Sequence, residues 1–231
     1  MLSTGEPSLA GFRLTAGRLE PMDGSRRDLA SGADPAQVGF TPDGASLVVT
    51  ERGTNSLQVF PVGDDGLLGE PVKTASSGAT PYGFAFGANG ALIVTEAFGA
   101  EKGKAAASSY RLTGTAAEPV TRSVGNGRSE ICWAVVTHDG YAFTTNFADG
   151  AVSSWSIGAD GSLKLEDAVA GTAVEGQTGL RDEDLSRDER FLYAVDADSG
   201  QIFGWSVEGS RLSPIGSWDG IPATVAGLAA S

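Results

Sequence analysis

One phrase returns along this chain at intervals of 45 to 50 residues. The segments "TPDGASLVVTE", ending at Glu51, and "GANGALIVTE", ending at Glu96, share a turn, an apolar strand and a closing Thr-Glu pair. A later segment of each repeat ends in an aromatic residue, at spacings of 48, 50, 45 and 50 residues: Phe12, Phe60, Tyr110, Trp155 and Trp205. Four short strands in a unit of about 40–50 residues are the signature of a β-propeller blade.

The residue patterns within a repeat predict its strands. The first segment is an apolar run, as in "PAQVGF" at 35–40 and "PYGFAF" at 81–86, which suits an inner strand packed on both faces. The dipeptides Asp-Gly and Asn-Gly that follow are turn sequences. With 33 glycines and only 19% charged residues, the composition favours short strands and tight turns over long helices. We therefore expect an all-β fold, a β-propeller of four-stranded blades with about five repeats present.

We expect residues 1–231 to form a single β-propeller domain. Four repeats are complete, while "IPATVAGLAAS" at 221–231 reads as a first strand with nothing after it, and "MLS" at the start reads as a stub. The two ends are expected to share one blade and close the ring, which would leave no open sheet edge. The clipped start indicates missing N-terminal blades, with a complete five-bladed ring as the alternative.

The composition excludes several classes of function. The net charge of −13 argues against nucleic acid and against anionic membranes, whose binding depends on Lys and Arg. A single cysteine, Cys132, allows no internal disulfide, and a single histidine, His138, allows no His-rich metal site. No segment has the length of a membrane span or the pattern of a signal peptide. We expect a cytoplasmic protein from the chain as given, or a secreted one if an N-terminal segment is missing.

Four polar residues recur at the ends of the second strands, spaced 45, 50 and 50 residues apart: Glu51, Glu96, Asn146 and Asp196. In a propeller this corner and the start of the first strand lie on one face, at the mouth of the central channel. We expect an acidic ring there. Gathered carboxylates raise one another's pKa, so that one of them could serve as a general base. The same four residues could instead hold Ca²⁺ or Mg²⁺, or simply cap turns.

Further residues are expected around this mouth as ligand contacts. Arg52 follows Glu51, and Arg181 lies at the start of a first strand, so either could hold a carboxylate or phosphate in a bidentate contact. The remaining candidates lie near the starts of the first strands: Gln37, Tyr82 and Trp133. We expect His138 to be an exposed turn residue on the opposite face, and Cys132 to be a packed thiol. The insert at 98–109 is a surface loop or a lid.

Three segments carry a resemblance to a known family. "ADPAQVGFTPDGASLVVTERGTNSLQVFPV", "ATPYGFAFGANGALIVTEAFG" and "SSYRL" resemble the lactonase-family seven-bladed propellers, the relatives of 6-phosphogluconolactonase and carboxymuconate cyclase. The resemblance implies part of a seven-bladed ring and action on a sugar or dicarboxylate lactone. It also implies a catalytic glutamate at Glu96, whereas Gln37 and Tyr82 stand where the family has histidine and arginine.

These observations leave three hypotheses for function. The first is a lactone hydrolase or cyclase with Glu96 as base and no cofactor. The second is a non-catalytic propeller that binds a ligand or partner at its mouth. The third is a divalent-metal lactonase using Glu51, Glu96, Asn146 and Asp196. In each enzymatic case the expected partner is a small lactone or acidic sugar.

Overall fold

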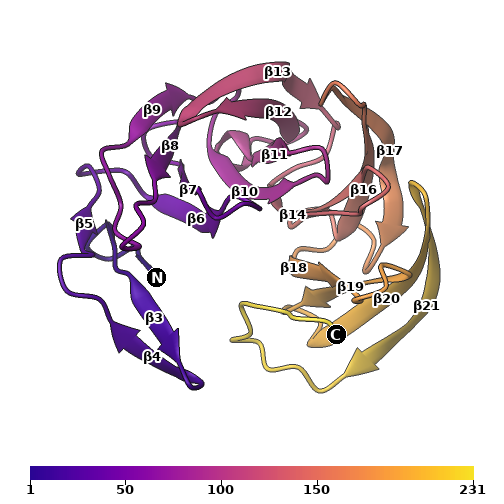
Figure 1. Cartoon of the computed structure of the whole chain (residues 1–231). Coiled ribbons are helices and arrows are strands. Elements are labelled where there is room, and N and C mark those ends of the chain that lie inside the picture. The colour runs from indigo at the N-terminus through magenta and orange to yellow at the C-terminus, as the bar shows by residue number, and fades with distance from the viewer.

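The computed structural model describes all 231 residues and arranges them as an open arc of sheets (Figure 1). Four of the sheets have four antiparallel strands each, joined in chain order. The first comprises β6 (Pro35–Phe40), β7 (Ser46–Glu51), β8 (Ser56–Pro61) and β9 (Val72–Ala75), and the second β10 (Pro81–Phe86), β11 (Ala91–Glu96), β12 (Ala106–Thr113) and β13 (Ala116–Gly125). The third comprises β14 (Ile131–Val136), β15 (Tyr141–Asn146), β16 (Ala151–Ile157) and β17 (Leu163–Thr172), and the fourth β18 (Leu180–Leu185), β19 (Phe191–Asp196), β20 (Gln201–Glu208) and β21 (Arg211–Asp219).

This architecture confirms the propeller of four-stranded blades. We number the four complete blades 1 to 4 in chain order, and the first strand of each is its inner strand. The insert at 98–109 contains one short 3-10 turn, η1 (Phe98–Ala100). No helix of the chain is long and apolar enough to cross a membrane.

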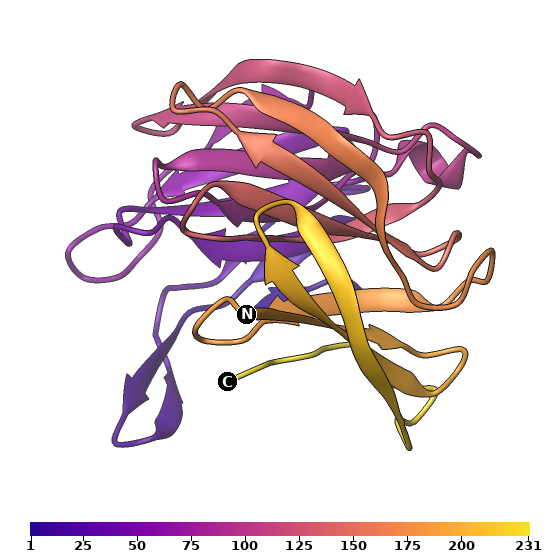
Figure 2. The same cartoon turned by 90° about the vertical axis from the view of Figure 1, so that its right-hand side faces the viewer.

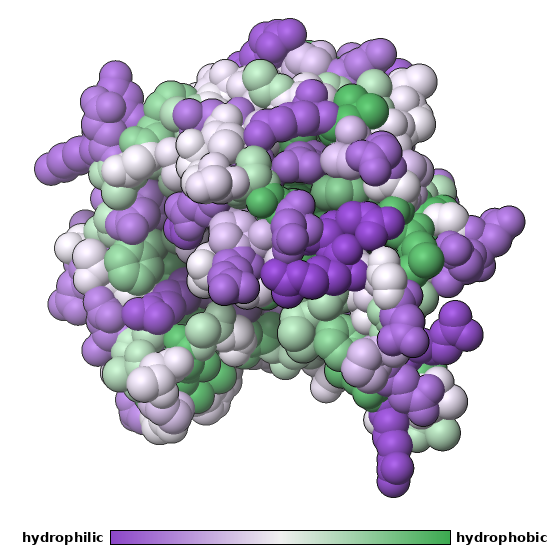
Figure 3. All heavy atoms as spheres, turned by 90° about the vertical axis from the view of Figure 1, so that its left-hand side faces the viewer, coloured by the Kyte–Doolittle hydropathy of each residue, from purple (hydrophilic) through white to green (hydrophobic).

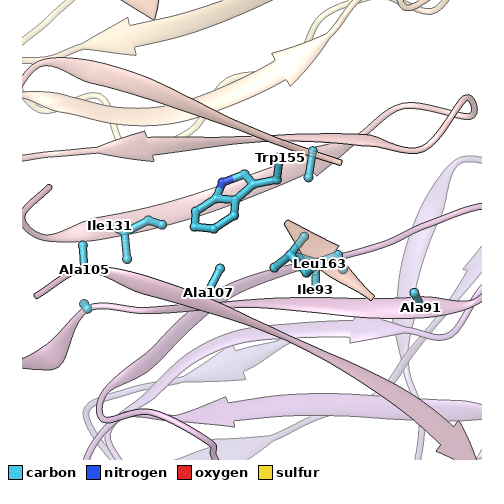
Figure 4. Close-up of a cluster of buried hydrophobic side chains, with 9 residues drawn as sticks. Ala91, Ile93, Ala105, Ala107, Ile131, Trp155 and Leu163 are labelled. Atoms are coloured by element: carbon cyan, nitrogen blue, oxygen red, sulfur yellow. The ribbon is translucent and has the colours of Figure 1, made fainter. Parts of the chain in front are cut away.

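The hydrophobic cores lie between neighbouring blades. One core joins Ile93 of β11 to Ile131 of β14 and Trp155 of β16, all completely buried (Figure 4). Tyr110 and Trp205, which end the third segments of their repeats, are likewise buried in such clusters. The recurring aromatic residue is therefore what fills the space between one blade and the next, and a buried aromatic ring supplies much of the apolar area that holds blades together.

The N-terminal region forms an incomplete blade. A three-stranded sheet comprises β1 (Leu2–Ser3), β2 (Ser8–Leu9) and β5 (Arg27–Asp28), and a separate hairpin comprises β3 (Phe12–Thr15) and β4 (Arg18–Pro21). Figure 2 shows this hairpin projecting from the body of the molecule.

The expected blade shared between the two termini is not formed, so that prediction is wrong. Residues 220–231 belong to no strand. The backbone N–H groups of Leu228 and Ala230 instead donate to the carboxylates of Asp182 and Asp184 on β18, at 2.8 and 2.9 Å. The two termini lie on opposite sides of the opening in the arc (Figure 1).

A threonine near the end of the second strand links each of the first three blades to the next. Each inner strand has a bulge near its start, where the register with the second strand shifts. Thr50 Oγ1 accepts a hydrogen bond from Gln37 N in this bulge and donates to the carbonyl of Tyr82 in the following blade, at 3.1 and 2.6 Å. Thr95 and Thr145 make the corresponding bonds to the carbonyls of Cys132 and Arg181. The threonine of the repeated Thr-Glu pair therefore fixes the position of the next inner strand.

Candidate functional site at the mouth face

The four polar residues at the ends of the second strands do not line the mouth. Their side chains are completely buried inside their own blades: Glu51, Glu96, Asn146 and Asp196. The predicted acidic ring is therefore wrong. In blade 3, for example, the Asn146 amide donates to Ser153 Oγ at 2.9 Å and accepts from Asn126 at 2.9 Å. These side chains satisfy buried polar groups at the corner of each blade, as buried polar groups in native proteins generally must be satisfied.

Glu51 is a buried carboxylate in blade 1 that forms an ion pair with the exposed Lys73. Its carboxylate accepts from Thr54 at 2.5 Å, from Ser56 at 3.0 Å and from the ammonium of Lys73 at 3.0 Å. Burial raises the pKa of Glu51, but hydrogen bonds from Thr54, Lys73 and Ser56 outweigh it and hold the pKa below its usual value. Glu51 is therefore charged and structural.

Glu96 occupies the same corner of blade 2 without a cation. Its Oε1 accepts from Gly78 N at 2.8 Å and from Ser108 at 2.5 Å, while Oε2 is buried with no hydrogen-bond partner. Burial raises the pKa of Glu96 above its usual value despite these bonds. A Cβ at Gly78 would lie 2.2 Å from Oε2, so the loop before β10 closes directly over the carboxyl group. Glu96 therefore faces this loop and not a ligand at the mouth.

The structure does not bring the expected metal ligands together. No group of three or more His, Cys, Asp or Glu side chains is placed so that it could hold a metal ion. The side chains of Glu51, Glu96, Asn146 and Asp196 are instead buried, each inside its own blade, so they do not meet at the channel. This burial contradicts the shared metal site.

Of the expected ligand contacts, three do lie together at the start of the inner strands. The Arg52 guanidinium lies over the Tyr82 ring, 5.1 Å from its centroid, and the Tyr82 ring meets Trp133 edge-on at 5.2 Å between centroids. All three side chains are partly exposed. Arg52 also forms an ion pair with Asp34, with Nη2 and Oδ1 2.6 Å apart. We call Arg52, Tyr82 and Trp133 the mouth platform.

Gln37 and Arg181 are placed differently from the platform. The Gln37 amide bonds both backbone groups of Phe84, donating to the carbonyl at 2.9 Å and accepting from the N–H at 2.7 Å, so it joins two blades. Arg181 lies 5.9 Å from the Phe147 ring centroid and donates to the Val225 carbonyl at 3.5 Å. Both polar atoms of the Gln37 side chain thus bond to Phe84, and Arg181 is partly covered by the C-terminal segment.

Glu130 is a mouth residue that the sequence patterns did not reveal. It directly precedes inner strand β14, and its backbone φ is 55°, a left-handed conformation that is uncommon outside glycine. The Cys132 thiol donates to the Glu130 backbone carbonyl at 3.5 Å, and Trp133 of the platform follows on the same strand. Burial in turn raises the pKa of Glu130 itself.

The backbone conformation at the position of Glu130 recurs in every repeat. The residue before each inner strand has a positive φ in all four complete blades: Asp34, Thr80, Glu130 and Gly179. In all four blades its carbonyl accepts from the N–H of the residue after the second strand, which is Arg52, Ala97, Phe147 or Ala197. This position therefore lies at the mouth in every repeat, and two of its four occupants are acidic.

The remaining titratable residues lie elsewhere. Glu183 of β18 is buried, and neither of its carboxyl oxygens has a hydrogen-bond partner; burial raises its pKa well above the usual value. Burial also raises the pKa of the Cys132 thiol to about 12, which confirms a packed thiol.

His138 is an exposed turn residue, as expected, and it bonds to Glu189. It borders a cavity of about 560 Å³ formed by the turns that join first and second strands.

The sheet arrangement and the mouth platform define an open-ring propeller of the type that presents residues around a channel mouth. The chain belongs to the family described as lactonase, 7-bladed beta-propeller, which matches residues 11–97 and 95–223. No curated protein matches the sequence.

Several solved structures share the fold. A protein from Lactobacillus plantarum is 18% identical, with a TM-score of 0.78, over 95% of this chain and 67% of its own. A candidate 6-phosphogluconolactonase from Bacteroides uniformis is 19% identical, with a TM-score of 0.74, over 95% of this chain and 67% of its own. The periplasmic gluconolactonase PpgL of Pseudomonas aeruginosa is 20% identical, with a TM-score of 0.64, over 91% of this chain and 63% of its own. Because the identities are low, these likenesses establish the fold alone.

Proposed function

We propose that this protein binds a small sugar or dicarboxylate lactone at the mouth platform and hydrolyses it. The observation that carries the proposal is the stacking of three side chains. The Arg52 guanidinium carbon lies 5.1 Å from the Tyr82 ring centroid, and the Tyr82 and Trp133 ring centroids are 5.2 Å apart. Aromatic side chains offer a small ring-shaped ligand an apolar surface. An arginine beside them can pair with a carboxylate or phosphate on the same ligand. Membership of a lactonase family supports the lactone as the ligand class.

In this proposal Glu130 takes the role of general base, in place of the buried Glu96. Glu130 accepts a proton from a water molecule while the water oxygen forms a bond to the lactone carbonyl carbon. The ring C–O bond then breaks, and the departing oxygen takes up the proton to give a hydroxy acid. Two features support Glu130: it is partly exposed at the start of the inner strand that carries Trp133, and burial raises its pKa above the usual value, which is the direction a general base needs. Burial also raises the pKa of Tyr82, so its hydroxyl stays protonated and can donate to the substrate.

The test is acid release from a panel of sugar and dicarboxylate lactones. Glu130→Gln is expected to lower kcat by about 10²–10⁴-fold with little change in ligand affinity. Glu101→Gln, an exposed residue of the insert, serves as the matched control and should behave as wild type. The proposal fails if no lactone is hydrolysed, or if Glu130→Gln retains full turnover.

A second candidate function is ligand binding without catalysis. The observation that favours it is that Gln37 and Glu96, at two positions where the family resemblance implies catalytic groups, both make structural contacts inside the fold. Calorimetric titration with the same lactones separates the two candidates. Binding that requires Arg52 and Trp133, in the absence of turnover, would support this second function.

A further inference from the structure

A cavity of about 560 Å³ lies at the end of the inner strands that is opposite the mouth. The turns that join the first and second strands of blades 1, 2 and 3 form it, together with the hairpin that joins β12 to β13. Every residue that lines it belongs to these three complete blades. Its volume falls in the range of about 300–1,000 Å³ that is typical of small-molecule sites. Because the mouth platform lies at the other end of the same strands, this cavity is separate from it.

The cavity lies over a turn that is built of small residues. Blade 1 has "TPDG" at 41–44 and blade 3 has "THDG" at 137–140, whereas blade 2 has "GANG" at 87–90. Glycine and alanine thus replace the threonine and the larger residue after it, which leaves room between the two flanking turns. The apolar part of the lining comes from three partly buried side chains: Phe86, Leu112 and Val136.

The blade 3 wall of the cavity is fixed by a residue of blade 4. Gly44, Gly90 and Gly140 end the turns of blades 1 to 3 with φ of 71, 77 and 88°, and Glu189 occupies this position in blade 4 with φ of 57°. A left-handed φ costs backbone strain for a residue other than glycine. The Glu189 carboxylate accepts from the His138 backbone N–H at 2.9 Å and also bonds to the His138 ring. The strained residue therefore holds this wall in place.

The blade 1 wall carries a carboxylate with one free oxygen. Asp43 Oδ1 accepts from Thr41 Oγ1 at 2.6 Å and from Ala45 N at 3.0 Å, whereas Oδ2 accepts no hydrogen bond within the chain. The bonds from Thr41 and Ala45 lower the pKa of Asp43, so the carboxylate is charged at neutral pH. None of the lining residues is Lys or Arg. The cavity thus combines an apolar surface with a negative charge and no positive one.

The protein as a whole also favours a cation. Hydrophilic residues cover much of the side of the molecule shown in Figure 3, and apolar residues lie between them in small groups. The chain carries a net charge of −13, and an excess of carboxylates attracts cations to a protein surface. A ligand that matches this cavity therefore has a positive group for Asp43 and an apolar part for the rest of the lining.

We propose that this cavity is a second ligand site, which binds a small primary amine with a compact apolar body. The ammonium group donates to Asp43 Oδ2, and such a charge-assisted hydrogen bond is stronger than a neutral one. The apolar body packs on Leu112, Val136 and Phe86, whose ring also attracts a cation. An amine has no part in the lactone chemistry proposed for the mouth, so each site can be tested without the other.

The experiment is calorimetric titration of the full chain with 2-phenylethylamine. Two further probes of similar shape differ from it in charge: 2-phenylethanol is neutral, and 3-phenylpropionate is anionic. We expect the amine to bind at least about tenfold more tightly than the alcohol, and the anion to bind more weakly than either. No binding of the amine, or equal affinity for the three probes, overturns the proposal.

Asp43→Asn tests the contact with the ammonium group. The amide oxygen of the variant can still accept from Thr41 and Ala45, so the turn is kept while the charge is lost. We expect affinity for the amine to fall by at least about tenfold and affinity for the alcohol to stay unchanged. Asp139→Asn is the matched control, because Asp139 accepts from Thr137 at 2.5 Å in the same turn of blade 3 but does not line the cavity. An equal loss in both variants would show a response to net charge alone and would overturn the site.

Ala88→Trp tests the place of binding independently of charge. Ala88 is an exposed turn residue that lines the cavity, so a large ring there should occupy the space without disturbing the fold. We expect this variant to keep the Tm of the wild type and to lose binding of both the amine and the alcohol. A variant with an unchanged Tm that still binds the amine with wild-type affinity would contradict the proposal.

Discussion

Thr95 ties two neighbouring blades together: its Oγ1 accepts from Gly83 N at 2.9 Å and donates to the carbonyl of Cys132 at 2.5 Å. Both partners belong to inner strands, Gly83 to blade 2 and Cys132 to blade 3. A methyl group in place of the hydroxyl would leave both backbone groups without this partner in a buried site. The positions of Tyr82 and Trp133, which flank these groups in sequence, therefore depend on Thr95.

Thr95→Val tests this link. We expect a loss of about 1–3 kcal/mol in the free energy of unfolding, since buried groups left unsatisfied cost that much each. Urea denaturation measures the change. Thr113→Val, at the exposed end of β12, is the matched control and should stay within about 0.5 kcal/mol of wild type. Equal stability of the two variants would mean that the threonine does not join the blades energetically.

The Glu51–Lys73 ion pair makes a prediction for blade 1. Glu51 is completely buried, while the Lys73 side chain is 43% exposed. Lys73→Met removes the only cation beside a buried carboxylate, and we expect a loss of about 1–3 kcal/mol at pH 7, reduced from the fully buried case by solvent screening. Lys164→Met, which breaks an exposed pair with Glu166, should leave the free energy of unfolding close to that of the wild type, because exposed pairs are screened by solvent.

Acid should remove the stabilisation that the Glu51–Lys73 pair gives to the folded protein. The pKa of Glu51 is lowered in the folded protein, so the folded state binds fewer protons than the unfolded state at this site. Its stabilisation is complete above the unfolded pKa of about 4.3 and is lost as the pH falls through the lower folded pKa. The stability difference between wild type and Glu51→Gln should therefore shrink below about pH 4. A constant difference from pH 7 to pH 3 would contradict this assignment.

The buried Glu183 predicts the opposite dependence of stability on pH. Burial raises its folded pKa well above its usual value, so the folded protein holds a proton that the unfolded chain releases above about pH 4.3. Stability then falls as the pH rises from the unfolded toward the folded pKa. Glu183→Gln should raise Tm near pH 7 and have little effect near pH 4. A lower Tm for the variant at pH 7 would show that the charged form is stabilised by a group that we have not identified.

The Cys132 thiol should be unreactive in the folded protein. Burial raises its pKa to about 12, so almost no thiolate exists at pH 8, and the thiolate is the reactive form. We expect no maleimide labelling within the time that labels the urea-unfolded chain completely. Thr95→Val, which removes the bond to the Cys132 carbonyl, should increase the labelling rate. Rapid labelling of the native wild type would mean that this inner strand opens locally.

The strands of the four complete blades could be predicted from the sequence because their signals are local and repeated. In blades 1 to 3 an Asp-Gly or Asn-Gly turn separates the first strand from the second, and every run from "SLVVTE" to "FLYAVD" forms the predicted second strand. The position of the Thr-Glu corner was also predicted. What the pattern could not show is the direction of the side chain at that corner.

Glu51 and Glu96 point into their blades because hydrogen-bond donors lie there. Ser56 and Ser108, on the neighbouring third strands, donate to these carboxylates at 3.0 and 2.5 Å. Serines in an otherwise apolar buried strand are the sequence signal for such an internal acceptor, since buried polar groups need partners. The candidate site was only partly predictable: the mouth platform of Arg52, Tyr82 and Trp133 follows from position in the repeat, whereas Glu130 lies one residue before the strand pattern begins.

The threonine link runs in one direction around the arc. Thr50, Thr95 and Thr145 each reach forward to a carbonyl of the next blade, but blade 4 has Val195 at the corresponding place. Valine has no hydroxyl, so the series of forward bonds stops there. In an array whose units contact only their neighbours, stability is shared along the series. Blade 4 is thus held in this series by one threonine bond, from Thr145 to the Arg181 carbonyl, and passes none on.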